Sequence, residues 1–110
     1  MNIYGKQVYG AEDEETRCSH YHQETDRIAL KCFCCREYYP CYKCHEEITG
    51  KPFEPWPAEY REEKAVLCGA CGTELTISGY LTSSSRCPAC RSAFNPGCAL
   101  HYHLYFEPKN

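Results

Sequence analysis

Apolar and polar residues alternate with a period of two in several short stretches of this chain. Residues 28–33 (IALKCF) alternate in this way, which predicts a β-strand. The apolar run at 65–68 (AVLC) predicts a second, buried strand. Residues 74–81 (ELTISGYL) predict a β-rich segment that Gly79 interrupts. The sequence HYHLYF at 101–106 also alternates and predicts a closing strand.

Other stretches predict turns and boundaries rather than strands. Residues 41–49 are expected to form a short helical turn. The segment KPFEPWPAEY at 51–60 contains three prolines, which resist regular structure. We therefore predict a metal-binding lobe at 1–60, with an N-terminal segment at residues 1–17, and a second lobe at 61–110.

The length, net charge and apolar content of the chain limit the kinds of protein that it can be. The hydrophobic core of a 110-residue chain gives only marginal stability unless disulfides or metal ions reinforce the fold. The net charge of −3 argues against a nucleic-acid partner. No apolar run reaches membrane-spanning length, and residues 1–10 lack the hydrophobic region of a signal peptide. These features predict a cytoplasmic protein without membrane contact or an evident small-molecule substrate.

The cysteines indicate whether disulfides or metal ions reinforce the fold. The chain has 11 cysteines, an odd number that disulfides alone cannot pair. Closely spaced pairs present two sulfurs to one ion, and the chain has four: Cys34 and Cys35, Cys41 and Cys44, Cys68 and Cys71, and Cys87 and Cys90. Two histidines, His20 and His45, lie among these pairs. Histidines have no use in a disulfide scaffold but complete tetrahedral zinc sites, so the pattern favours zinc.

The second lobe has the spacing of a zinc ribbon. Cys68-x-x-Cys71 is separated by fifteen residues from Cys87-x-x-Cys90, and we expect those residues to form a hairpin that brings the two pairs together. Four thiolates complete the coordination of one zinc ion and leave no position for water or substrate. The ribbon site is therefore predicted to be structural.

The first lobe carries a more specific pattern. Cys18-x-His20-Tyr21 is followed by Cys34-Cys35 and then by Cys41-x-x-Cys44-His45. This order resembles the CHY-type zinc finger, whose name comes from a Cys-x-His-Tyr start. The resemblance extends from about Val8 to Glu107 and includes the stretches TRCSHY, CCREYYPCYKCH, AVLCGACGTELTI and FNPGC.

The resemblance implies a small metal-stabilised α+β fold, in which a cross-braced CHY-type lobe precedes a β zinc ribbon. It implies three zinc ions. One ion belongs to the ribbon. The ligand sets of the other two ions interleave along the chain. One set is Cys18, His20, Cys41 and Cys44, and the other is Cys34, Cys35 and His45 with a second histidine.

This chain departs from the family pattern at Lys51, where the second histidine would stand. A lysine ammonium has no lone pair with which to bind zinc. The chain is therefore expected to hold two or three zinc ions. Cys32 is a candidate substitute ligand that could equally extend the apolar face of its strand. Glu46, Glu47 or a water molecule could also take the vacant position, or the site could stay empty.

A further group, Cys98, His101 and His103, can be read as a metal cluster, but we favour a packed terminal strand. The main functional hypothesis is zinc binding by a structural finger that contacts a protein partner and has no catalytic activity. The alternative is a thiol or zinc redox or assembly factor, which the resemblance to stand-alone fungal proteins of the mitochondrial intermembrane space implies. A third class, zinc hydrolysis, would need an open zinc and a general base.

Overall fold

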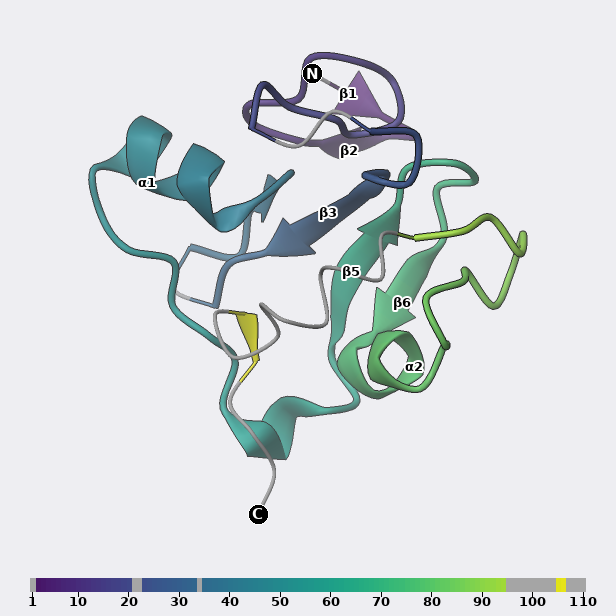
Figure 1. The fold of residues 1–110 in the computed structure, drawn as a ribbon. Helices are drawn as coiled ribbons and strands as arrows, with labels where there is room; N and C mark the ends of the chain where they lie inside the picture. The colour runs from purple at the N-terminus through teal and green to yellow at the C-terminus, as the bar shows by residue number, and fades with distance from the viewer. Residues whose placement is uncertain (1, 21–22, 34, 95–104, 107–110) are drawn as a thin grey trace.

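The computed structural model describes residues 2–20, 23–33, 35–94 and 105–106. Its main feature is a four-stranded antiparallel sheet with the strand order β4-β3-β5-β6 (Figure 1). The strands of this sheet are β3 (Ile28–Lys31), β4 (Tyr38–Tyr39), β5 (Lys64–Cys68) and β6 (Glu74–Thr76). A separate two-stranded ribbon, β1 (Asn2–Ile3) and β2 (Lys6–Gln7), precedes them.

The strands predicted at 28–33 and 65–68 are confirmed, and they pair with each other. In the register of β3 and β5, Ala29 lies opposite Leu67 and Leu30 lies opposite Val66. All four side chains are buried, which accounts for the apolar runs. One sheet therefore contains strands from both sides of residue 60. The division into two lobes near that residue stays a prediction.

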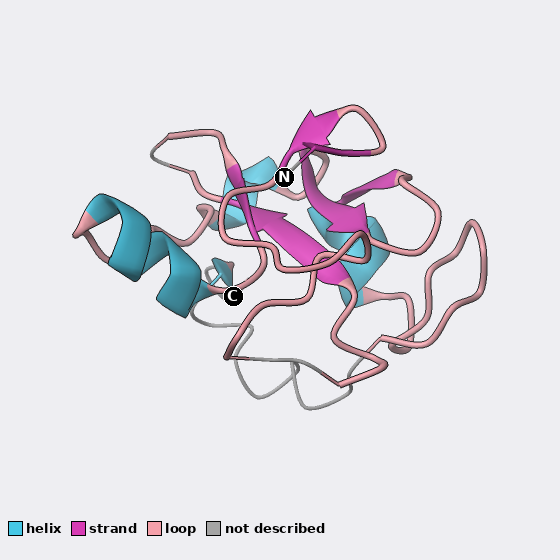
Figure 2. Cartoon of the chain, turned by 90° about the horizontal axis from the view of Figure 1, so that it is seen from above, coloured by secondary structure: helices cyan, strands magenta, loops and turns pink. Residues whose placement is uncertain are grey.

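Within the described residues, two α-helices contact the sheet. Helix α1 (Tyr42–Thr49) confirms the predicted helical turn and lies to one side of the sheet in both ribbon views (Figures 1 and 2). Helix α2 (Ile77–Leu81) corrects our prediction of a β-rich segment interrupted by Gly79 at 74–81, because only Glu74–Thr76 is a strand. The side chain of Thr76 caps this helix by accepting a hydrogen bond of 2.9 Å from the Gly79 amide. The cap turns the chain into a helix directly after β6.

The fifteen residues between the ribbon cysteine pairs are therefore not the simple hairpin that the spacing predicted. They contain β6 and α2. The proline-rich segment has only a short 3-10 helix (Ala58–Tyr60), in agreement with its composition. Within it, Trp56 is fully buried and donates a hydrogen bond of 2.7 Å from its indole nitrogen to the carbonyl of Lys31.

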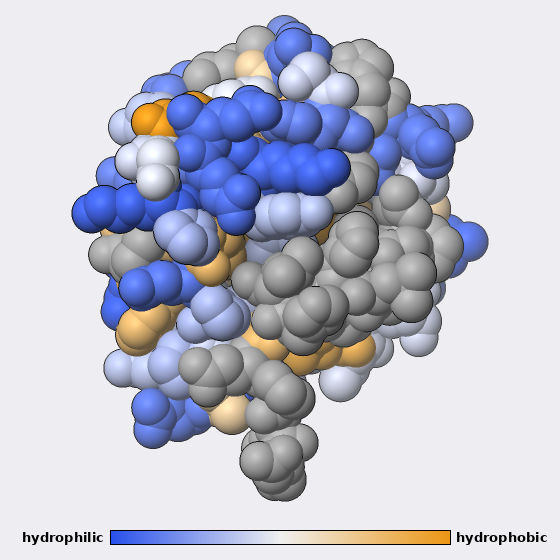
Figure 3. Space-filling model, turned by 60° about the vertical axis from the view of Figure 1, so that its left-hand side comes forward, coloured by the Kyte–Doolittle hydropathy of each residue, from blue (hydrophilic) through white to orange (hydrophobic). Residues whose placement is uncertain are grey.

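Buried aromatic side chains come from the sheet and from the proline-rich segment. Tyr38, Tyr39, Phe53 and Trp56 are all buried, so they contribute to the core. The face on the α1 side of the molecule is mainly hydrophilic where described residues cover it, with small separate apolar areas (Figure 3). No helix within the described ranges is long and apolar enough to cross a membrane.

Part of the predicted closing strand, residues 101–104, lies outside the described residues, as do Cys98 and the two histidines considered with it. Phe106 is described and forms an isolated parallel bridge with Trp56. Both side chains are buried, so this part of the chain does contact the core.

Candidate metal centres

The first centre brings together Cys18, His20, Cys41 and Cys44, the set that the resemblance implies. Cys41 precedes α1 as its N-cap and Cys44 lies in the first turn of the helix, while Cys18 and His20 belong to the loop before β3. The three cysteines are almost fully buried. Helix α1 therefore supplies two ligands from its N-terminal end, where backbone amides favour negative charge.

The distances in this first centre fit one tetrahedral zinc ion. The Cys18 and Cys41 sulfurs are 3.7 Å apart, as are those of Cys41 and Cys44. The Nδ1 atom of His20 lies 3.5 Å from two of the sulfurs and 3.8 Å from the third. Zinc with sulfur at about 2.3 Å and nitrogen at about 2.0 Å gives tetrahedral edges of about 3.8 Å and about 3.5 Å.

An outer-sphere contact holds the His20 ring in place. Its Nδ1 faces the sulfurs, so Nε2 carries the proton and donates to the Glu47 carboxylate at 2.7 Å. Glu47 belongs to α1, the helix that also supplies Cys44. The hydrogen bond to Glu47 raises the pKa of His20 above its ordinary value. Carboxylate–histidine–metal arrangements of this kind orient the ring and make the nitrogen a stronger ligand.

The ribbon centre consists of the four predicted cysteines, Cys68, Cys71, Cys87 and Cys90. The sulfurs of Cys68 and Cys90 are 3.8 Å apart, and those of Cys71 and Cys87 are 3.7 Å apart. These separations are far longer than a disulfide bond and match the edge of a zinc–thiolate tetrahedron. Zinc therefore fits this site with four protein ligands and no open position.

The backbone around each ribbon pair follows one pattern. The Gly72 amide donates to the Cys68 carbonyl at 2.9 Å, and the Arg91 amide donates to the Cys87 carbonyl at 2.8 Å. Gly72 and Arg91 both have positive φ angles, of 80° and 67°. In each knuckle the residue after the second cysteine thus turns the chain back over the metal site.

The same pattern occurs a third time, at Cys32 and Cys35. The Arg36 amide donates to the Cys32 carbonyl at 2.8 Å, the Cys32 amide donates to the Glu37 carbonyl at 3.0 Å, and Arg36 has a φ of 61°. The turn from Cys32 to Arg36 therefore shares the backbone hydrogen bonds of the two ribbon knuckles. The spacing is visible in the sequence, but the adjacent pair Cys34-Cys35 offers a competing assignment there.

This turn and His45 form the third centre, in which the ligand atoms of Cys32, Cys35 and His45 lie within 4.8 Å of one another. His45 is buried and packs edge-on against Tyr39 and Phe53. Its Nδ1 lies 3.0 Å from the backbone carbonyl of Lys51, to which it donates. Nε2 is then the nitrogen left to bind a metal.

The structure thus brings Cys32 into the position of a ligand, a role that the sequence left open. Cys34, which the family resemblance implies for this site, lies outside the described residues. Neither Glu46 nor Glu47 belongs to this group of ligand atoms, and Glu47 contacts His20 instead. Among the described residues, the third centre has three candidate ligands.

The crowded sulfurs also indicate a cation. Contact with Cys18 raises the pKa of Cys41 to about 11, because neighbouring thiolates disfavour one another. Burial raises the pKa of Cys68 in the ribbon. A positive ion bound between such thiols would compensate the charge of their thiolates. Zinc supplies this charge, and its role in the two four-ligand centres is to hold distant parts of the chain together.

The family can now be assigned. The sequence profile of the CHY zinc finger matches residues 18–96, which include all three centres. The chain belongs to the CHY zinc finger family. The CHY-type resemblance and the small α+β fold with zinc as its cofactor are thereby confirmed.

Three relatives match this CHY zinc finger protein over nearly its whole length. Two are named Helper of Tim protein 13. The one from Saccharomyces cerevisiae is 44% identical, with 96% of this chain and 90% of the relative covered. The one from Kluyveromyces lactis is 45% identical, with 98% and 94% covered. An uncharacterized protein of Schizosaccharomyces pombe is 43% identical, with 96% and 89% covered. No solved structure matches the chain significantly.

Proposed function

We propose that this protein is an assembly factor for a Tim-type protein in the mitochondrial intermembrane space, and that it acts through thiol or zinc chemistry at the third centre. The name Helper of Tim protein, carried by two relatives that align over nearly the full chain, supports a protein partner of this type. It favours the mitochondrial alternative over the cytoplasmic location expected from the sequence.

The chemical part of the proposal rests on a comparison of the candidate ligands in the three centres. The first and the ribbon centre each have four candidate ligands, whereas the third has three among the described residues. Cys35 of this centre is exposed and lines a pocket with His45. Sites with four buried or partly buried ligands suit a scaffold, and the third suits exchange, because its Cys35 thiol can be reached from the pocket.

The same comparison favours a binding role over catalysis. Zinc hydrolysis needs a general base beside an open metal position. Glu47 contacts His20 of the first centre, and Glu54 is the one carboxylate among the described residues that line the pocket, where it is not grouped with the ligand atoms. We therefore propose a non-enzymatic role, in which the closed centres shape the protein and the third centre contacts the partner.

Complementation in Saccharomyces cerevisiae tests this function. The chain replaces the yeast Helper of Tim protein 13, and we measure where it is located and how much of the yeast Tim-type complexes assembles. We expect wild type and the exposed-surface control Glu62→Gln to locate to the intermembrane space and restore assembly. Cys35→Ser should remain folded, at a wild-type level, and fail. Full activity of Cys35→Ser would contradict a role for the third centre, and a cytosolic location would contradict the proposal as a whole.

A further inference from the structure

Two of the four candidate ligands of the first centre come from a loop. Cys18 and His20 lie between β2 and β3, in a segment that we call the ligand loop and that comprises residues 11–20 and 23–27. Within these described residues the loop contains no helix or strand. Its conformation therefore depends on side-chain contacts and on the surface against which it packs.

Arg17 holds the ligand loop together. Its guanidinium donates to the backbone carbonyls of Gln23 and Glu24, each at 2.7 Å. It also forms ion pairs with the carboxylates of Asp13, at 3.1 Å, and Glu15, at 2.8 Å. These partners lie on both sides of the two zinc ligands in the sequence, so contacts on either side of the loop help to place both ligands.

The ligand loop packs against the first knuckle of the ribbon centre. Gly69 lies in this knuckle, between Cys68 and Cys71, and is buried. Its amide donates to the Arg27 carbonyl at 2.7 Å. A methyl carbon added at Gly69 would lie 2.9 Å from this oxygen and 2.6 Å from the carbonyl carbon of Glu15. The loop thus touches the knuckle on both sides of its zinc ligands, at a distance that leaves no room for a side chain.

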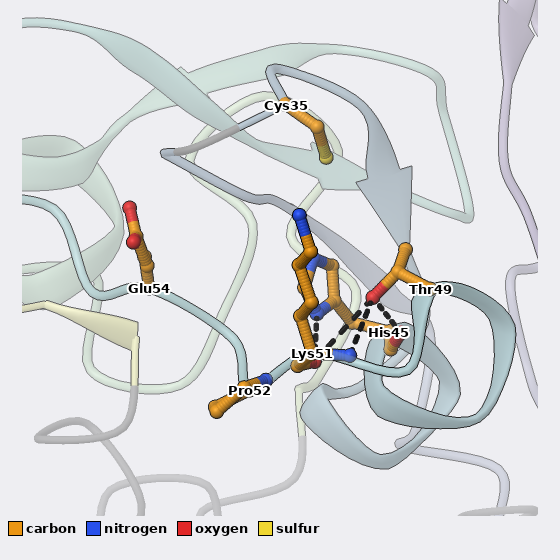
Figure 4. A pocket seen from close by; sticks show the side chains of 6 residues that line it. All are labelled: Cys35, His45, Thr49, Lys51, Pro52 and Glu54. Atoms are coloured by element: carbon orange, nitrogen blue, oxygen red, sulfur yellow. Dashed lines mark hydrogen bonds between the residues drawn. The ribbon is translucent and has the colours of Figure 1, made fainter.

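The third centre lies at the other end of β3. Ile28, at the start of this strand, lies opposite Cys68 of the ribbon centre. Cys32 follows the end of the strand, about 13 Å from Ile28 at the usual rise per residue. It is grouped with Cys35 and His45, which line the pocket beside this centre (Figure 4). The contact between the ligand loop and the knuckle is therefore remote from the third centre.

This contact connects two zinc sites that share no ligand. The knuckle is fixed when both of its cysteines bind the ribbon ion. A fixed knuckle offers the ligand loop the surface on which it packs, so the loop loses less conformational entropy when its own two ligands bind an ion. Two sites coupled in this way typically alter each other's affinity by about 5- to 150-fold.

We propose that the first centre and the ribbon centre bind zinc cooperatively, and that the contact of Gly69 with the ligand loop is the link between them. The third centre takes no part in this coupling. The two four-ligand centres then form one unit that loads and empties together more sharply than separate sites would. The proposal is independent of the Tim-type partner and of thiol exchange, so complementation bears on neither its success nor its failure.

Thiol alkylation in buffered free zinc tests the proposal, because a zinc-bound thiolate is protected from the reagent. Peptide mapping follows each cysteine, and the midpoint is the free zinc concentration that protects half of a given thiol. Cys18 reports on the first centre, Cys87 on the ribbon centre, and Cys32 with Cys35 on the third.

Two double variants each remove one centre. Cys87→Ser with Cys90→Ser removes the ribbon centre, and Cys41→Ser with Cys44→Ser removes the first. The ribbon centre is expected to load first, because its fourth thiolate adds to the attraction for the ion. Loss of the ribbon centre should therefore raise the first-centre midpoint about fivefold or more, while the third-centre midpoint stays the same. The ratio of first-centre midpoints without and with the ribbon centre is the coupling factor.

A substitution at the contact tests the link itself. Gly69→Ala adds the methyl carbon for which the ligand loop leaves no room, and it should bring the coupling factor close to one. Pro88 has the same place in the second ribbon knuckle and is exposed. Pro88→Ala is therefore the matched control and should keep the wild-type factor.

Four results would overturn the proposal. The coupling is refuted if removal of either centre leaves the midpoint of the other unchanged. A third-centre midpoint that rises as much as the first-centre midpoint also refutes it, because the effect then comes from loss of the whole fold. An unchanged coupling factor in Gly69→Ala excludes the knuckle contact as the link. If Gly69→Ala weakens all three centres equally, Arg17→Gln decides, since it acts within the loop: it should lower the coupling factor, and an unchanged factor refutes the link through the loop.

Discussion

The contact between Glu47 and His20 gives the most direct prediction about metal affinity. Glu47→Gln keeps an oxygen that can accept the proton of His20 Nε2, but it removes the negative charge from a contact of 2.7 Å. Glu47→Ala removes the contact completely. Because the zinc–sulfur geometry of the first centre is untouched in both variants, any change in zinc affinity reports how strongly the carboxylate supports the imidazole.

The expected loss of zinc affinity depends on how exposed the Glu47 and His20 side chains are. Outer-sphere partners of metal-bound histidines are worth roughly 10- to 100-fold in metal affinity. The Glu47 side chain is 67% exposed, so solvent screens its charge and we expect the lower end of this range. Glu47→Gln should lose up to about tenfold at the first centre, equivalent to about 1.4 kcal/mol. Glu47→Ala should lose about tenfold or more.

Competition with a chelator at neutral pH, with bound zinc counted per chain, measures this effect. One zinc ion should become easier to remove in the Glu47 variants, while the ribbon ion should not change. Glu46→Gln, an exposed residue on the same helix, is the matched control. Wild-type affinity in Glu47→Ala would refute the reasoning, as would a loss confined to the ribbon centre.

The pH dependence of zinc affinity tests the same contact between Glu47 and His20. Glu47 raises the pKa of His20, so in wild type a proton competes for this nitrogen from a higher pH than in Glu47→Gln. The affinity difference between the two proteins should therefore be largest at neutral pH and shrink as the pH falls through the raised pKa. A difference that grows in acid would contradict this assignment.

Three further predictions concern zinc and the fold. Removal of all zinc should unfold the protein, because structural zinc contributes roughly 10–16 kcal/mol in small domains; a cooperative melt that survives complete chelation, followed by circular dichroism, would disprove this. Acid titration with zinc counting should release zinc from the first centre before the all-cysteine ribbon, because Glu47 raises the pKa of His20 and a proton competes for its nitrogen early in the titration; simultaneous release would contradict this order. Gly72→Ala should lower the melting temperature, because φ is 80° and an added methyl carbon would lie 2.4 Å from the Tyr4 ring; Ser84→Ala, an exposed turn residue, should have little effect.

The sequence by itself determined the features that depend on short spacing. Two residues between cysteines fix a knuckle that offers both sulfurs to one ion, so the ribbon set from Cys68 to Cys90 could be read directly. The order of ligands in the first lobe was sufficient for the family. Apolar alternation located β3 and β5, because strand periodicity is a property of neighbouring residues.

Only the tertiary structure decided contacts between distant positions. Glu47 meets His20 across 27 residues of sequence, and no local pattern marks such a pair. Cys32 is grouped with Cys35 and His45 by a turn that a backbone hydrogen bond from Arg36 shapes, whereas in the sequence it suited the apolar face of its strand equally well. The pocket beside the third centre also needed coordinates, because a pocket is formed by residues that the fold brings together, here Cys35 and the turn around Lys51.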